Sequence, residues 1–310
     1  MLAGSPQVAK ALQADSSEEW VRLERQAALR LPAGFVPLGV TGLRSNLIAA
    51  WSRDRIVVFE NGTSRLIDPK LPGSIVSVAF RDVRTADILT TNPNAVARLA
   101  VGPMIDNSAI AGSAKGIRSL PVHVLSATLV DSTWYIAGLD AAERVGVYRV
   151  GSGVTARRLV TLPAKARPEG EPETYHITAN GHRIVLTALH QPFEVLVWDG
   201  DDVERLPFPR LPEASNDGSW ISLPVIALSK ELYLRTISDL TSDRRLLQLL
   251  SGEMTRAVRL ELPLALTHSI VGTCYMLATL QGVAAEVLLF RWTAVNVSSD
   301  STARCSDDRH

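Results

Sequence analysis

A series of six Leu-Pro dipeptides divides the chain into units of similar length. Their leucines are Leu31, Leu71, Leu120, Leu162, Leu211 and Leu262. Successive units are therefore 40, 49, 42, 49 and 51 residues long, and 48 residues follow the last leucine. Periods of this size are typical of repeat architectures, with helical repeats and propeller blades as the main candidates. A repeat limits the fold strongly, because each unit must bury its apolar face against a neighbour.

Each unit contains short runs with the alternation of β-strands. The third unit reads VHVLSATLVD, STWYIAGLD, ERVGVYRV and VTARRLVTLP, with Gly, Asp and Ser between the runs. These runs are rich in Val, Ile, Thr and aromatic residues, which favours strands and turns over a helical stripe. Four runs per unit predict a four-stranded antiparallel sheet.

The fourth run of most units carries an Arg-Leu dipeptide shortly before the Leu-Pro. These dipeptides are Arg65-Leu66, Arg158-Leu159, Arg205-Leu206 and Arg259-Leu260. A charged residue protects an exposed sheet edge from further pairing, and proline ends a strand. The fourth run is therefore expected to be the outermost strand of its sheet, and the Leu-Pro the point where the chain turns toward the next unit.

Six units of four strands resemble a six-bladed β-propeller. The resemblance is to an all-β architecture over residues 25–297, since the WD40 and kelch signatures are absent. It implies blades at 33–72, 73–121, 122–163, 164–212, 213–263 and 264–297, the last joined by 25–31. Residues 1–24 would form a partly helical extension and 298–310 a polar tail.

The first Leu-Pro predicts how the ring closes. RQAALRLP at 25–32 matches RAVRLELP at 256–263, although no complete unit precedes it. We expect residues 25–31 to be the outer strand of the last blade, which would close the ring. In the alternative, a helix capped by Ser16 and Glu19 occupies this region and TAVNV at 293–297 is the outer strand. We favour closure by the N-terminal strand, with a short helix ending near residue 24.

Composition narrows the class of partner. The 32 basic and 32 acidic residues balance, which argues against a nucleic-acid surface. No apolar run approaches the ~18 residues of a membrane helix, and the N-terminus lacks the pattern of a signal peptide. We therefore expect a soluble, monomeric, cytoplasmic protein without a membrane span.

Loops on one face of the predicted ring are rich in carboxylates. In a propeller, the loops that join blades and those that join second to third strands lie on this face, around the channel. The predicted binding face comprises Asp54, Asp140, Glu143, Glu171, Glu173, His190, Asp217, Asp239 and Asp243. An acidic face suits a cation or a basic protein or peptide. The alternative is that these loops are simply polar, as loops are.

Histidines are the candidates for chemistry. His123, His176 and His268 lie on predicted first strands and His190 on a loop that faces the channel. Converging imidazoles could bind a divalent metal or act as a general base, which makes His176, His268 and His190 candidate ligands. His123 lies too far along its strand for a shared site. The competing interpretation is isolated histidines satisfied by the backbone.

Two functions follow from these features. The first is a non-catalytic module that binds a protein or peptide through the acidic face, with no cofactor. The second is a hydrolase, lyase or isomerase that acts on a small molecule in the channel through His176, His268 and Glu173, with or without a metal. The first needs no special residues, and we favour it.

Overall fold

The computed structural model describes the chain in segments. These are residues 21–101, 114–151, 156–163, 173–190, 194–199, 202–207, 220–222, 224–228, 232–239, 245–251, 257–260, 265–271, 275–280 and 286–294. Every regular element within them is a β-strand, and all the pairings are antiparallel. Among these residues there is no helix long and apolar enough to cross a membrane.

Four consecutive sheets are simple four-stranded meanders. The first contains β2 (Gly39–Arg44), β3 (Leu47–Trp51), β4 (Ile56–Glu60) and β5 (Thr63–Ile67), and the second β6 (Ser74–Phe80), β7 (Thr85–Thr91), β8 (Ala95–Ala100) and β9 (Lys115–Ser119). The third contains β10 (His123–Val130), β11 (Thr133–Leu139), β12 (Val145–Val150) and β13 (Ala156–Thr161), and the fourth β14 (Tyr175–Asn180), β15 (Arg183–Ala188), β16 (Glu194–Asp199) and β17 (Asp202–Pro207). The predicted Arg-Leu strands β5, β13 and β17 are outermost in their sheets, as expected.

The two remaining sheets depart from this plan. One has a divided inner strand, because β18 (Trp220–Ser222) and β19 (Ile226–Ala227) both pair with β20 (Leu232–Asp239), which is followed by β21 (Arg245–Ser251) and β22 (Ala257–Leu260). The other is built from both ends of the chain, in the order β1 (Val21–Arg30), β25 (Glu286–Ala294), β24 (Tyr275–Leu280) and β23 (Ala265–Val271).

The innermost strands bring the sheets into a closed series. β2 contacts β6, β6 contacts β10, β10 contacts β14, β14 contacts β19, β19 contacts β23, and β23 returns to β2. Four-stranded antiparallel sheets arranged around a common axis define a β-propeller. The chain therefore has the predicted all-β propeller fold.

Tight turns fix the register within the sheets. Asn61 and Gly62 join β4 to β5 with φ of 50° and 81°, the backbone of a type I′ hairpin, for which Asn-Gly is the preferred sequence. Asp131 and Ser132 make the same left-handed turn between β10 and β11, with φ of 46° and 64°. Two-residue turns fix which residues pair across the hairpin. A shift of one residue would move every apolar side chain to the other face of the sheet.

The core lies between neighbouring sheets. Ile56 and Val58 of β4 pack with Ile88 and Leu99 of the next sheet, and similar clusters join four further pairs of neighbouring sheets. Because each sheet buries both faces against its neighbours, its central strands are apolar on both sides. All five residues of β3 are buried.

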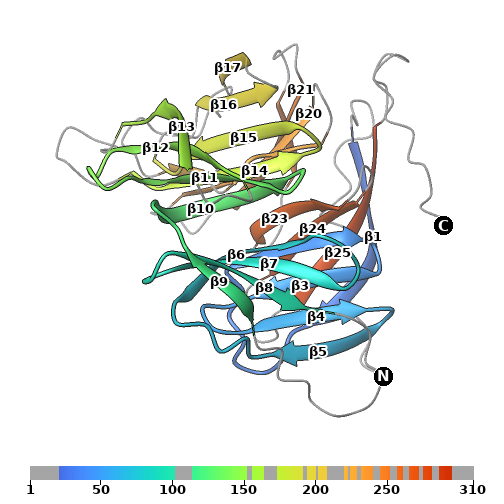
Figure 1. Ribbon diagram of the computed structural model, residues 1–310. Helices are drawn as coiled ribbons and strands as arrows, with labels where there is room; N and C mark the ends of the chain where they lie inside the picture. The colour runs from blue at the N-terminus through green and yellow to red at the C-terminus, as the bar shows by residue number, and fades with distance from the viewer. Residues whose placement is uncertain are drawn as a thin grey trace.

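The N-terminal strand pairs with the last sheet, as predicted. β1 lies antiparallel to β25 from Val21 opposite Ala294 to Arg30 opposite Glu286, with a bulge after Arg25. Figure 1 shows the blue N-terminal strand beside the red C-terminal one. The alternative outer strand at 293–297 is excluded, because residues 293 and 294 belong to β25 itself.

The expected helix ending near residue 24 is wrong for residues 21–24, which are already part of β1. The helical interpretation started from the possible cap formed by Ser16 and Glu19. The nine-residue strand β25 offers a long free edge, and pairing with it satisfies the backbone of these residues. Residues 1–20 lie outside the described part of the chain.

Candidate functional site: the central cavity and the loop face

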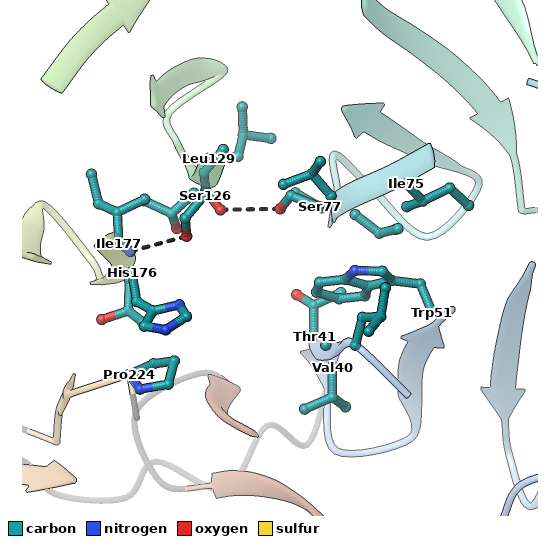
Figure 2. Close-up of a pocket in the computed structure, with 18 of the residues that line it drawn as sticks. Val40, Thr41, Trp51, Ile75, Ser77, Ser126, Leu129, His176, Ile177 and Pro224 are labelled. Carbon is teal, nitrogen blue, oxygen red and sulfur yellow. Dashed lines mark hydrogen bonds between the residues drawn. The ribbon is translucent and has the colours of Figure 1, made fainter. Parts of the chain in front are cut away.

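A cavity of about 520 Å³ runs between the innermost strands. Residues of β2, β6, β10, β14 and β19 line it, joined at one end by Arg53 from the loop after β3. Figure 2 shows β2 residues on one side of this space and His176 of β14 on the other. The cavity is therefore the central channel of the propeller.

Serine side chains join the inner strands around this channel. The Ser77 hydroxyl donates to the Ala127 carbonyl at 3.1 Å, and the Ile177 amide donates to the Ser126 hydroxyl at 3.1 Å. The inner edges of these strands have no further strand to pair with, so side chains satisfy their backbone groups. These bonds hold the channel wall in a fixed shape.

Hydrogen bonds from side chains to backbone carbonyls also join the fourth sheet to the divided inner strand of the next sheet. The Thr178 hydroxyl donates to the Val225 carbonyl at 2.5 Å, and the Asn180 amide donates to the Ala227 carbonyl at 2.8 Å. The proton of the Thr178 hydroxyl is therefore used in a hydrogen bond within the protein. Sequence alternation alone gave no signal for these roles, because they depend on which strands become neighbours.

The cavity wall exposes polar backbone groups and hydroxyls together with apolar side chains. Among the described residues that line it, only Arg53 and His176 are ionisable, and none is a carboxylate. Trp51 packs against the backbone of Gly39 at the Arg53 end, where a Cβ atom on Gly39 would lie 2.0 Å from the indole ring. At pH 7, Arg53 is therefore the one charged side chain among the described residues that line the channel.

His176 is the predicted site residue that the structure places in the channel. Burial lowers the pKa of its imidazole to about 4, so the ring is neutral at pH 7. The half-buried ring points into the cavity, and it makes no hydrogen bond to another described residue. Neutral imidazole can both donate and accept a hydrogen bond.

Glu173 and His190, both predicted site residues, contact each other. The Glu173 carboxylate is buried and accepts hydrogen bonds from the Thr174 amide at 2.9 Å, the His190 amide at 3.1 Å and His190 Nδ1 at 3.2 Å. Its second oxygen, Oε2, is buried without a partner among the described residues. Neither residue is among those that line the channel cavity, so the structure separates them from His176.

The other histidine candidates do not join His176 in a described cluster. His268 lies in β23 opposite Ala278, and its side chain is outside the described part. His123 Nδ1 lies 3.4 Å from the Thr91 hydroxyl. No group of three or more His, Cys, Asp or Glu residues in the described ranges could hold a metal ion.

Carboxylates of the predicted binding face have different surroundings. Asp54 is 74% exposed and lies 3.6 Å from Arg55, and Glu143 is exposed. Asp140 is mostly covered and pairs with Arg144 at 2.7 Å, whose hydrogen bond holds the pKa of the carboxyl at about 2. Of the remaining acidic residues, Asp239 has only its backbone described, in β20, while Glu171, Asp217 and Asp243 lie outside the described residues.

Solved structures share this architecture at low sequence identity. A triple arginine-to-alanine variant of AofleA from Arthrobotrys oligospora has a TM-score of 0.50 at 10% identity, over 92% of this chain and 92% of that one. The sialidase of Trypanosoma rangeli, in complex with the inhibitor DANA, has a TM-score of 0.50 at 10% identity, over 86% of this chain and 58% of that one. The β-propeller domain of Swd1 from Myceliophteria thermophila has a TM-score of 0.46 at 8% identity, over 86% and 99%.

No family model matches the chain, and no curated protein matches it. The two structures with a TM-score of 0.50 bear on the fold alone. Together with the sheet order and the central cavity, they identify the chain as a β-propeller of four-stranded antiparallel blades.

Proposed function

We propose that this chain is a six-bladed propeller that binds a protein or peptide partner on the loop face around the mouth of the channel. The six antiparallel sheets and the closed series of inner-strand contacts support six blades in one ring. A ring of this kind presents its loops as one continuous surface, which suits recognition of a partner.

The observation that carries the proposal is a mixed apolar and charged patch at the mouth. It consists of Val36, Leu38, Arg53 and Asp54, which we call the mouth patch. Val36 and Leu38 are 59% and 50% exposed, and the Leu38 amide donates to the Trp51 carbonyl at 2.8 Å, which holds the first loop beside the second. Leu38 and Arg53 both line the cavity.

Exposed apolar side chains bordered by charges are typical of protein interaction sites. The two aliphatic side chains would contact an apolar group of the partner. Asp54, which is 74% exposed, would face a basic group, in keeping with the acidic residues predicted on this face. The positive charge of the exposed Arg53 next to Asp54 reduces the preference of the mouth patch for basic groups. We therefore expect a partner with one apolar side chain and a single positive charge beside it.

The test compares two equally exposed sites. Immobilised wild-type protein, a Val36→Asp/Leu38→Asp variant and a Leu66→Asp control are incubated with extract from the native source, and captured proteins are quantified by mass spectrometry. Leu66 is 47% exposed on the outermost strand β5, away from the mouth. We expect a partner that binds wild type and the control, but not the double variant, and that binds again as purified protein. Equal capture by all three proteins would contradict the proposal.

A second candidate function rests on the Glu173–His190 pair. A buried carboxylate that accepts from Nδ1 orients an imidazole and leaves Nε2 as a base, which is the arrangement that hydrolases use. This pair would support the alternative of a propeller enzyme, a hydrolase, lyase or isomerase on a small molecule. Hydrolysis of 4-nitrophenyl acetate that is lost in His190→Gln and kept in His182→Gln would favour it, and equal rates in these variants would reject it.

A further inference from the structure

Arg53 places a positive charge at the mouth of the channel. Its side chain is exposed and forms no ion pair or hydrogen bond with another described residue. The adjacent Asp54 carboxylate accepts a hydrogen bond from the Ser52 hydroxyl at 2.9 Å and lies 3.6 Å from Arg55 Nε. No described residue that lines the cavity is a carboxylate. The guanidinium group of Arg53 is therefore available to an anion that enters the mouth.

A hydroxyl group next to Arg53 is also unused by the fold. The Ile75 amide donates to the Arg53 carbonyl at 2.7 Å, which holds this loop beside the start of β6, where Ser74 lies. The half-buried Ser74 lines the cavity, and its hydroxyl makes no hydrogen bond to another described residue. It differs in this from Ser77 of the same strand, whose hydroxyl donates to the Ala127 carbonyl. Arg53 and Ser74 together offer N–H and O–H donors at the mouth.

Two further polar side chains lie deeper in the channel. Gly39 of β2 pairs with Trp51, two residues before Arg53, and Thr41 lies two residues further along β2. At ~3.3 Å per residue, Thr41 is roughly 7 Å below the mouth. Figure 2 shows Thr41 and His176 on opposite sides of the cavity, and neither makes a hydrogen bond to another described residue. The channel therefore combines a positive charge at its mouth with hydrogen-bonding groups inside.

We propose that the channel binds a small hydroxylated anion, whose carboxylate or phosphate group pairs with Arg53 and whose hydroxyl groups hydrogen-bond to Ser74, Thr41 and His176. This is a second binding site, beyond the partner surface of the mouth patch, with which it shares Arg53. The cavity volume of about 520 Å³ lies in the range of small-molecule pockets, roughly 300–1,000 Å³. A monosaccharide that carries an acidic group is long enough to reach from Arg53 to Thr41.

The polarity of the wall favours a hydrophilic ligand. The wall exposes backbone groups and hydroxyls together with apolar side chains, and polar groups that lose water without new hydrogen bonds cost free energy. A hydroxylated molecule replaces the hydrogen bonds to water, and the neutral imidazole of His176 can donate to it or accept from it. The anionic group stays at the exposed guanidinium, so it gains charge-assisted hydrogen bonds without losing all its hydration.

The experiment compares glucuronate and glucose 6-phosphate with glucose, because the three share a hydroxylated ring and differ in the charged group. Binding to the full chain is measured by isothermal titration calorimetry at pH 7, in a low-salt buffer without phosphate or carboxylates. We expect at least one of the two anions to bind with a Kd below about 1 mM and at least tenfold more tightly than glucose. The anion that binds more tightly identifies the charged group, and its advantage over glucose should shrink in about 0.5 M NaCl.

Two variants and a matched control locate the site. Arg53→Gln should weaken binding of the preferred anion about tenfold, and Thr41→Val should weaken it several-fold. Arg84→Gln is the control, because Arg84 is an exposed arginine in the turn after β6, at the opposite end of that strand from Ser74. The control should bind the anion as wild type does.

Three results would each overturn the proposal. They are no preference for either anion over glucose, equal losses in Arg53→Gln and Arg84→Gln, and unchanged anion binding in Arg53→Gln or Thr41→Val. If Arg53→Gln lowers capture of a protein partner but leaves anion binding unchanged, Arg53 belongs to the mouth patch alone. The mouth patch itself is tested by protein capture in a variant that keeps Arg53, so failure of one proposal is distinguishable from failure of the other.

Discussion

Central and outermost strands of one blade have opposite burial. In the second sheet, five of the seven residues of the central strand β7 are buried, whereas all five residues of the outermost strand β9 are exposed. Neighbouring sheets cover both faces of the central strands, while most residues of the outermost strands β5, β9 and β13 are exposed. The difference shows that the central strands of a blade carry the core and that the outermost strand contributes little to it.

One outermost strand should be an exception to this rule. β1 is outermost, yet it joins the two ends of the chain, and buried Leu31 and Phe35 follow it. Deleting residues 1–30 should remove most of the free energy of unfolding, typically about 5–15 kcal/mol in a domain, because both the β25 edge and the adjoining core become exposed.

Chemical denaturation measures this loss. The matched control replaces residues 115–119 of the exposed strand β9 with a Gly-Ser segment of equal length and should cost far less. If the two variants unfold at the same denaturant concentration, β1 has no special role.

A buried carboxylate gives the next largest expected effect. Asp87 in the central strand β7 is 1% exposed and accepts hydrogen bonds from Arg81 at 2.5 Å and Arg98 at 3.0 Å. Asp87→Ala should cost about 3 kcal/mol, because it leaves the largely covered guanidinium of Arg81 without its counter-charge, while the half-exposed Arg98 can be solvated. Arg158→Ala on the outermost strand β13, which is 3.9 Å from Asp140, should cost less than about 1 kcal/mol in the same urea titration. A small loss for Asp87→Ala would contradict the assignment.

An apolar pair tests the comparison directly. Ile88 in β7 is fully buried, while Ile117 in β9 is 48% exposed. Ile88→Ala should lower the free energy of unfolding by about 2–5 kcal/mol through lost burial and a cavity, and Ile117→Ala by about 0.5 kcal/mol or less. Similar losses in the two variants would mean that β7 and β9 are not central and outermost strands of one blade.

Lowering the pH should destabilise the fold through protonation of His176 on the inner strand β14. The pKa of its ring is about 4 when folded and 6.5 when exposed, so between these pH values the unfolded chain binds more protons. The free energy of unfolding should therefore fall as the pH drops from about 6.5 to 4, by at most about 3 kcal/mol, and should not depend on this residue above that range. His176→Gln should flatten the dependence in this window. The Asp140 carboxyl, with a pKa of about 2, loses its contribution only below about 3.8. An unaltered profile in His176→Gln would exclude the role of His176.

Much of the fold could be predicted because the blades repeat. The Leu-Pro series and the Arg-Leu dipeptides located the ends of the sheets and the outermost strands β5, β13 and β17. The match between 25–32 and 256–263 predicted that β1 pairs with the C-terminal sheet. The sequence analysis missed the first residues of β1. In a segment this short, the apolar residues fit the period of a helix and the period of a strand equally well.

The site could be predicted only in part, because it depends on distances across the ring. Strand position correctly placed His176 at the channel. Nothing in the sequence indicated that Glu173 would be buried against His190, since residues from two loops meet only after the sheet has folded. Asp87 offered a weak signal, a carboxylate within the apolar run ADILTT near two arginines.

The pairing of the two chain ends is the central claim, because it closes the channel and gathers the loops on one face. Arg30 and Glu286 are opposite residues of β1 and β25, and their side chains approach to 4.0 Å. An Arg30→Cys/Glu286→Cys variant, made in a Cys274→Ser/Cys305→Ser background, should oxidise to an intramolecular disulfide. The account predicts a monomeric product with faster mobility on a non-reducing gel and a higher melting temperature. Free thiols or only intermolecular disulfides under oxidising conditions would contradict it.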